Sequence, residues 1–277
     1  PMRIIASSSR RAVDRLIDRG QRTDPTIARR VARIVAAVRR SGDPAVLRYA
    51  RRFDQLAAPA EVSRDEMQSG LSAIDPTLRT ALRTSAKHIR RIARRQVPRA
   101  WRTAVVPGVE IEQRVSPLNR VGCYVPAGRY PLPSSLLMTA IPAQVAGVTE
   151  TIVMCPRPDP TVLAAAAIAD VTRLFRLGGA QAIAALAYGT ETIPKVDKIV
   201  GPGSAYVAAA KALVAADCPI DFHAGPTEIV IVATSGNPAW IAADLIAQAE
   251  HDPDARAIVV TTDRALAERI TEQVKAR

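Results

Sequence analysis

Two side chains near the C-terminal end of the sequence have the spacing of neighbouring metal ligands. Gln248 and His251 lie three positions apart at the end of an expected helix over 240–250, so they share one helix face. An imidazole nitrogen is a good zinc ligand, and an amide oxygen is a weak one. A histidine at a helix end also interacts with the helix dipole, and the spacing by itself favours that second interpretation.

Four glycine-containing loops could bring the backbone close to a nucleotide. Glycine allows close approach, and a helix N-terminus attracts phosphate. The sequence has no GxGxxG motif, the usual signature of dinucleotide binding. Two interpretations of these loops therefore remain open: a nucleotide cleft at one edge of a sheet, or a set of plain turns. Whether His223, just before the last loop, lines a site is open as well. The loops lie at 124–128, 178–181, 201–204 and 224–228.

Two kinds of element must position these loops. Residues 1–100 have the periodicity of amphipathic helices, with a capping aspartate before proline at Asp24, Asp43 and Asp75. A hairpin is expected over 101–115 around Pro107 and Gly108. From residue 120 onward, short apolar strands alternate with helices, which predicts an α/β fold with parallel sheets covered on both faces.

The strands of this α/β part are predicted at 121–125, 151–155, 174–177, 198–200, 228–234 and 257–261. The helices between and after them are predicted at 136–146, 160–169, 180–187, 205–215, 240–250 and 263–275.

Composition limits the class of protein. A chain of 277 residues with 48% hydrophobic residues is long enough for two domains with buried cores. No apolar run reaches the length of a membrane span, and no secretory leader is expected at the start. The three cysteines, Cys123, Cys155 and Cys218, lack CxxC spacing, which favours a cytoplasmic protein with buried thiols.

The charge is unevenly distributed. Residues 1–120 hold 26 Lys and Arg against 11 Asp and Glu, a net charge of +15, whereas residues 121–277 have a net charge of −3. The basic residues stand at helical spacing among apolar ones, which is typical of a solvated helix surface. A basic nucleic-acid-binding protein is the alternative from another class, but no nucleic-acid-binding motif supports it.

The motifs together resemble the histidinol dehydrogenase family in order and spacing, over nearly the whole sequence. The helical part also fits, with Asp43 and with Phe53 and Asp54 in the places that the family would have them. The motifs are VGCYVP at 121–126, GGAQAIAAL at 178–186, PKVDKI at 194–199 with GPG at 201–203, ID at 220–221 with AGPTE at 224–228, and DLIAQAEH at 244–251.

The resemblance implies a fold and a reaction. Family members are zinc-dependent homodimers that oxidise an amino alcohol, here L-histidinol, to the acid in two NAD-linked steps through an aldehyde. Their body consists of two incomplete Rossmann-like domains, one inserted in the other, preceded here by an N-terminal helical segment. The implied boundaries give N-terminal helices and the first part of domain 1 at 1–121, the inserted NAD-binding domain at 122–226, and the continuation of domain 1 at 227–277.

The resemblance also assigns site residues. Tyr124, Gln181 and Ser204 correspond to the NAD contacts, although Ser204 replaces the usual asparagine and Ala127 replaces a usual glycine. Gln248 and His251 correspond to two zinc ligands that also contact the substrate, and Thr227 corresponds to a further substrate contact.

The family's catalytic Glu-His pair and two more zinc ligands, an Asp and a His, would lie beyond Arg277. No catalytic residue is therefore assigned within this sequence. We expect this chain alone to bind zinc weakly and to turn over negligibly.

Two alternatives to histidinol oxidation remain open. A paralogous enzyme could act on another small hydroxylated substrate, such as sulfopropanediol, and a non-catalytic basic fragment could only bind. The partners expected are a small-molecule substrate and, at full length, a second copy of the chain, with neither nucleic acid nor membrane.

Overall fold

The computed structural model describes residues 2–17, 24–57, 59–127, 130–222, 228–250 and 255–277. The chain divides into two compact units. One, the sheet unit, is Thr23–Ala224, and the other, the terminal unit, combines Pro1–Arg22 with Gly225–Arg277. The sheet unit is thus inserted between two parts of the terminal unit, while the domain boundaries at 121/122 and 226/227 stay a prediction.

The sheet unit begins with helices whose ends are fixed by short-range hydrogen bonds. The Asp24 side chain accepts from the Thr26 N–H at 2.8 Å at the start of α2 (Pro25–Tyr49), and Asp75 caps α4 (Pro76–Gln96) in the same way. Helix α3 (Arg64–Ala73) begins with a complete capping box. Helix α2 bends at Gly42, where φ is +53°, so the second helix start predicted at Asp43 lies at this bend.

Five strands form the sheet of this unit in the order β1-β6-β5-β4-β7. The four strands from β6 to β7 pair in parallel, which confirms the predicted α/β fold with a parallel sheet. The strands are β1 (Glu61–Val62), β4 (Arg120–Tyr124), β5 (Glu150–Met154), β6 (Arg173–Phe175) and β7 (Lys198–Val200). Strand β1 pairs antiparallel with β6 at the sheet edge, and the sequence analysis did not predict it.

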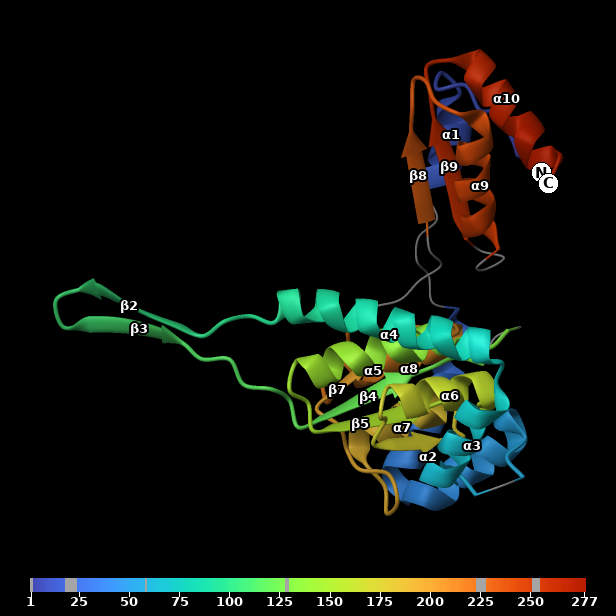
Figure 1. Cartoon of the computed structure of the whole chain (residues 1–277). Helices are drawn as coiled ribbons and strands as arrows, with labels where there is room; N and C mark the ends of the chain where they lie inside the picture. Colours follow the sequence, from blue (N-terminus) through green and yellow to red (C-terminus); the bar gives the residue numbers. More distant parts are fainter. Residues whose placement is uncertain (1, 18–23, 58, 128–129, 223–227, 251–254) are drawn as a thin grey trace. The chain divides into compact units, whose positions relative to one another are not determined.

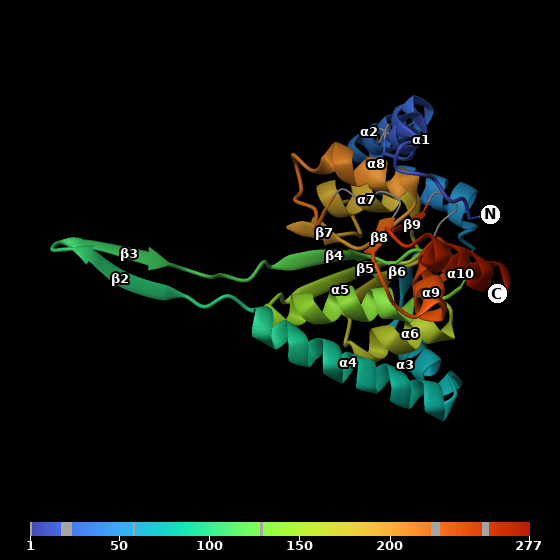
Figure 2. The same cartoon turned by 90° about the horizontal axis from the view of Figure 1, so that it is seen from above.

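Helices cover both faces of this sheet (Figure 2). Helices α3, α4, α5 (Pro133–Val145) and α6 (Pro160–Ile168) pack on the face that carries Val153 and Cys155. Helices α2, α7 (Gly179–Tyr188) and α8 (Ala205–Val214) pack on the face that carries Ile152 and Met154. The side chains of β5 therefore alternate between two buried cores, as expected for a strand of a covered parallel sheet.

A separate antiparallel hairpin, β2 (Trp101–Val106) and β3 (Val109–Gln113), confirms the hairpin predicted around Pro107 and Gly108. Every residue of both strands is exposed. Glycine suits position 108 because its φ of +83° is unfavourable for residues with a Cβ.

The terminal unit contains α1 (Arg10–Ile17), β8 (Glu228–Val232), α9 (Pro238–Ala249), β9 (Arg256–Val260) and α10 (Arg264–Lys275), which Figure 1 labels. Strands β8 and β9 pair in parallel, and their helices share one apolar cluster around Ile241, Leu245, Leu266 and Ile270.

No helix among the described residues is long and apolar enough to span a membrane. All three cysteines are buried free thiols.

Candidate functional site

The order of the strands creates a switch point beside β4. The chain runs from β4 through α5 to β5 on one side, and later returns through α7 to β7 on the other side. In such sheets, ligands bind outside the carboxyl ends of the strands at the position where the strand order reverses. The loops after β4, β6 and β7 all leave from this edge.

Tyr124 ends β4 and joins two of these loops. Its hydroxyl oxygen accepts a hydrogen bond from the Gly179 N–H at 3.0 Å, at the first residue of α7. Burial, together with the nearby Asp54 carboxylate, raises the pKa of the Tyr124 phenol to about 12, although the hydrogen bond from Gly179 offsets part of that rise. The side chain therefore stays a neutral hydroxyl at any physiological pH.

Gln181 lies in the first turn of α7 and is buried, with 1% of its surface exposed. Its amide nitrogen donates to Asp54 Oδ2 at 3.0 Å, and the Gly178 N–H donates to the same oxygen at 3.0 Å. Burial raises the pKa of Asp54, and the two hydrogen bonds and the Arg157 charge offset part of that rise. Asp54 thus fixes both the loop and the predicted cofactor residue.

The loop after β7 is held by a buried ion pair. Lys211 on α8 is 1% exposed, and its Nζ donates to the Gly201 carbonyl oxygen at 2.9 Å and pairs with the Asp221 carboxylate. The Gly201 N–H donates to the other Asp221 oxygen at 2.8 Å. Ile220 pairs with Ile199 in a parallel bridge and so brings Asp221 to this edge.

Only glycine fits at position 201. Its φ is +112°, and a Cβ there would lie 2.2 Å from the Tyr124 carbonyl oxygen. Ser204 follows as the N-cap of α8 but its side chain makes no capping bond. The first-turn N–H groups of α8 consequently lack a side-chain acceptor, which suits an anionic group.

The loops after β6 and β7 border one cavity of about 830 Å³, which we call the nucleotide cleft after the ligand that the sequence predicts for this edge. Gln181, Ser204 and Gly179 line it together with Asp54. Three arginines line it as well, namely Arg30, Arg33 and Arg52, and Arg30 donates to the Tyr206 hydroxyl at 3.2 Å.

The cleft arginines form no ion pair with any acidic side chain that the structure describes. Their charge is therefore available to a ligand that carries phosphate groups.

The predicted zinc and substrate residues belong to the other unit. Gln248 lies half-buried in the last turn of α9. Thr227, His251 and His223 lie outside the described residues, so the spacing of His251 from Gln248 stays a prediction. Within the described ranges, no group of three or more His, Cys, Asp or Glu side chains could hold a metal ion.

The sequence analysis assigned no role to Asp54, Lys211 or Asp221. Asp54 was noted only as part of a motif, and its partners are 124 and 127 positions away along the chain. Lys211 did carry a signal, because it is the single charged residue of the apolar helix α8 (AYVAAAKALV). A buried ammonium requires a paired carboxylate, but the sequence did not indicate which one.

Comparison with known proteins gives consistent matches. A family model described as histidinol dehydrogenase matches residues 17–277. The histidinol dehydrogenase of Syntrophotalea carbinolica is 47% identical over 272 residues, which cover 95% of this chain and 63% of the relative. That of Rhodospirillum rubrum is 49% identical over 255 residues, which cover 89% and 59%.

A solved structure agrees with these matches. The crystal structure of histidinol dehydrogenase from Elizabethkingia anophelis superposes with a TM-score of 0.88 at 33% identity, and the match covers 95% of this chain and 63% of that one. The chain thus spans about 63% of the length of the first relatives that it matches.

Proposed function

The chain belongs to the histidinol dehydrogenase family, and on this premise we propose that it carries the nucleotide-binding part of an enzyme that oxidises L-histidinol to L-histidine with NAD and zinc. The observation that carries the proposal is the nucleotide cleft itself. It lies beside the switch point of the parallel sheet, and it is lined by three arginines that have no ion-pair partner among the described residues.

The residues of the cleft fit NAD. Arg30, Arg33 and Arg52 supply positive charge for the pyrophosphate, and the first turn of α8 after Ser204 supplies N–H donors. The glycine at position 201 lets the loop before α8 lie against the Tyr124 carbonyl oxygen, which fixes the approach of the chain to the α8 N-terminus. When bound, NAD accepts a hydride from the carbon that carries the hydroxyl group.

Gln181 would form part of the wall of this site, and Tyr124 would lie behind it, against Gly179. The Tyr124 hydroxyl is held by the Gly179 N–H, and its proton remains available for donation to the cofactor. The Gln181 amide nitrogen is held by Asp54, so its carbonyl oxygen is the atom left to accept. Asp54 is thus a positioning residue for Gln181.

The two predicted zinc ligands do not form a complete metal site. Gln248 and His251 give one weak oxygen donor and one nitrogen donor, whereas zinc sites in proteins require three or four ligands. These two residues alone do not fit a zinc ion, so we derive no step of the reaction through it. Thr227, Gln248 and His251 as substrate contacts, a homodimer, and a cytoplasmic location remain predictions from the resemblance.

The first test measures binding of NADH by the 277-residue chain, with the fluorescence of NADH as the signal. The double variant Arg30→Glu/Arg33→Glu should bind at least about tenfold more weakly, because it places carboxylates beside the phosphates. The matched control Arg29→Glu/Arg40→Glu changes two exposed arginines of the same helix outside the cleft and should stay within about twofold. Equal affinities of the two variants would contradict the location of the site.

Substrate identity needs a second assay. NADH formation should be measured with L-histidinol and with sulfopropanediol, each with added zinc, on an enzyme that contains this chain. Faster NADH formation with L-histidinol supports the proposed reaction, and faster formation with sulfopropanediol transfers the proposal to the paralogous one.

A further inference from the structure

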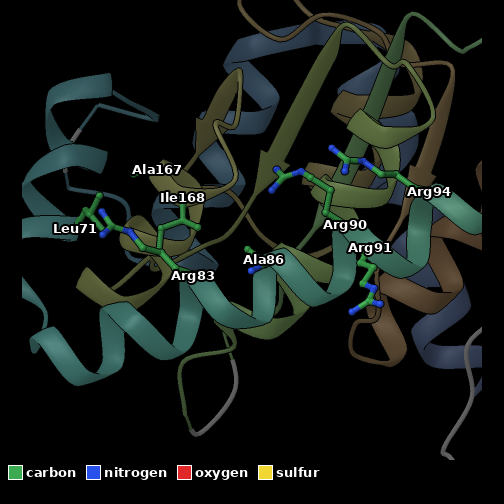
Figure 3. Close-up of a pocket in the computed structure, with 9 residues that line it drawn as sticks. Leu71, Arg83, Ala86, Arg90, Arg91, Arg94, Ala167 and Ile168 are labelled. Carbon is green, nitrogen blue, oxygen red and sulfur yellow. The ribbon is translucent and has the colours of Figure 1, made fainter.

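A second cavity lies on the opposite face of the sheet unit, along α4 where this helix meets α3 and α6 (Figure 3). Its volume is about 790 Å³, and no residue lines both this cavity and the nucleotide cleft. We call it the basic groove, because five cationic side chains of α4 border it: Arg83, Lys87, Arg90, Arg91 and Arg94.

The positive charge of the groove is not neutralised within the sheet unit. Helix α4 contains no Asp or Glu between Pro76 and Gln96. None of the five cations takes part in an ion pair or a side-chain hydrogen bond within the part of the chain that the structure describes. Like charges three and four positions apart destabilise a helix by about 0.2–0.5 kcal/mol per pair. The charges of this row therefore do not stabilise the helix that carries them.

The floor of the groove is apolar. It consists of Leu71 from α3, Ala86 from α4, and Ala167 and Ile168 at the end of α6. No aromatic side chain lines the groove, so the stacking platforms typical of single-stranded nucleic-acid sites are missing from its described lining. An apolar floor with a cationic border favours a ligand that has an apolar side and several negative charges.

The cations have a regular spacing. Arg83, Lys87, Arg90 and Arg94 follow one another at i, i+4, i+7 and i+11, and Figure 3 shows Arg83, Arg90 and Arg94 on the same side of the helix. At 1.5 Å per residue this row is about 16 Å long, or three helical turns. A second helix with carboxylates at the same spacing would oppose each cation, and arginine pairs well with carboxylates.

From this charge and spacing we propose that the basic groove docks an acidic amphipathic helix of a partner protein. Its carboxylates would pair with the α4 cations, and its apolar side would cover Leu71 and Ile168, which are half-buried. Such helix-in-groove recognition uses anchors at i, i+3, i+4 and i+7. The inference does not depend on the proposed enzymatic function.

The probe is a fluorescein-labelled helical peptide of about 18 residues, long enough for five turns. It carries Glu at four positions spaced i, i+4, i+7 and i+11, with Leu along the adjoining face. The control peptide has the same composition in scrambled order. Fluorescence anisotropy should show the ordered peptide binding at least about tenfold more tightly than the scrambled one.

Protein variants locate the site. Arg90→Glu/Arg94→Glu should weaken binding of the ordered peptide at least about tenfold, whereas Arg79→Glu/Arg95→Glu, the same charge change on α4 outside the groove, should stay within about twofold. Because acidic residues near a helix C-terminus destabilise it, Arg90→Gln/Arg94→Gln is a second variant with a smaller loss of the same direction.

Three results would overturn the proposal: equal binding of the two peptides, equal losses in the two double Glu variants, or no loss in the Gln variant. A competition experiment provides a fourth test. Inorganic polyphosphate and a single-stranded DNA oligonucleotide, at equal charge concentration, should displace the ordered peptide less well than the unlabelled peptide does. Better displacement by either polyanion would assign the groove to phosphate ligands instead.

Discussion

Strands β5 and β8 have the same apolar, β-branched character and the same parallel pairing, yet they differ in the exposure of their side chains. In β5, every residue after Glu150 is buried, because helices cover both faces of the five-stranded sheet. In β8, exposed and half-buried residues alternate: Ile229 and Ile231 are half-buried against α9 and α10, whereas Val230 and Val232 are 56% and 76% exposed.

The difference shows which features of a parallel strand follow from its sequence pattern. The pattern determines the strand and its pairing, since both strands were predicted near their observed positions. It does not determine which elements cover the second face, because that depends on helices elsewhere in the chain. The nucleotide cleft occurs where coverage is complete, since loops fixed by buried residues can hold backbone groups in place for a ligand.

The largest effect is expected from a substitution that removes the buried ion pair holding the loop after β7. Lys211→Met keeps the side-chain length but leaves Asp221 and the Gly201 carbonyl without their ammonium partner. We expect it to lower the free energy of unfolding of this unit by about 3–5 kcal/mol. The exposed pair of Arg39 and Asp217 is the control, and Arg39→Met should cost less than about 1 kcal/mol. Urea unfolding followed by circular dichroism measures both, and equal costs would contradict the assigned role of the buried pair.

A smaller effect is expected from a single methyl group. Gly201→Ala combines an unfavourable φ of +112° with a Cβ only 2.2 Å from the Tyr124 carbonyl, so it should destabilise by about 2–3 kcal/mol. Gly108→Ala has an unfavourable φ of +83° but no atom within 4 Å, and should cost only about 1 kcal/mol. Thermal unfolding compares the two; if Gly108→Ala is the more costly, the close contact at position 201 does not control stability.

The two sheets can be compared directly with matched valines. Val153→Ala in β5 removes buried methyl groups and should cost about 2 kcal/mol. Val230→Ala in β8 removes methyl groups that are more than half exposed and should cost less than about 0.5 kcal/mol. Hydrogen exchange of the amides of each unit reports each cost separately. A larger cost at Val230 would mean that its side chain is covered in solution.

The smallest effect is a pH dependence from Asp54. Its pKa is raised by burial above the ordinary value of 3.8, so the folded state holds the proton more tightly than the unfolded state. Stability therefore falls as the pH rises from 3.8 through the raised pKa, and then stays lower. Asp54→Asn should remove this component, by less than about 1 kcal/mol. Urea unfolding of both proteins between pH 4 and 7 tests it, and parallel curves would contradict the pKa shift.

Sequence patterns were most reliable where the signal is local. The start of α4 follows from the Asp75-Pro76 pair, and the hairpin follows from Pro107 and Gly108, because each motif acts within a few residues. The two-residue strand β1 has no periodicity of its own and exists through its pairing with β6. Its position was therefore not predictable from the sequence.

The candidate site was predicted in part for the same reason. Glycine loops after strands indicated the sheet edge, and the resemblance singled out Tyr124, Gln181 and Ser204, which the structure brings to that edge. The cleft arginines come from α2 and from the π-helical segment Ala50–Asp54 after it, more than a hundred positions before Gln181 and Ser204. That these arginines gather at one cavity follows from the packing of the helices on the sheet, which the sequence does not show.

The location of the nucleotide cleft is tested most directly by hydrogen exchange of the 277-residue chain with and without saturating NAD. We predict slower exchange at the amides of residues 178–182 and 201–207, with no change at residues 83–94 of the basic groove. Unchanged exchange at both loops, or slowing confined to the basic groove, would contradict the assignment.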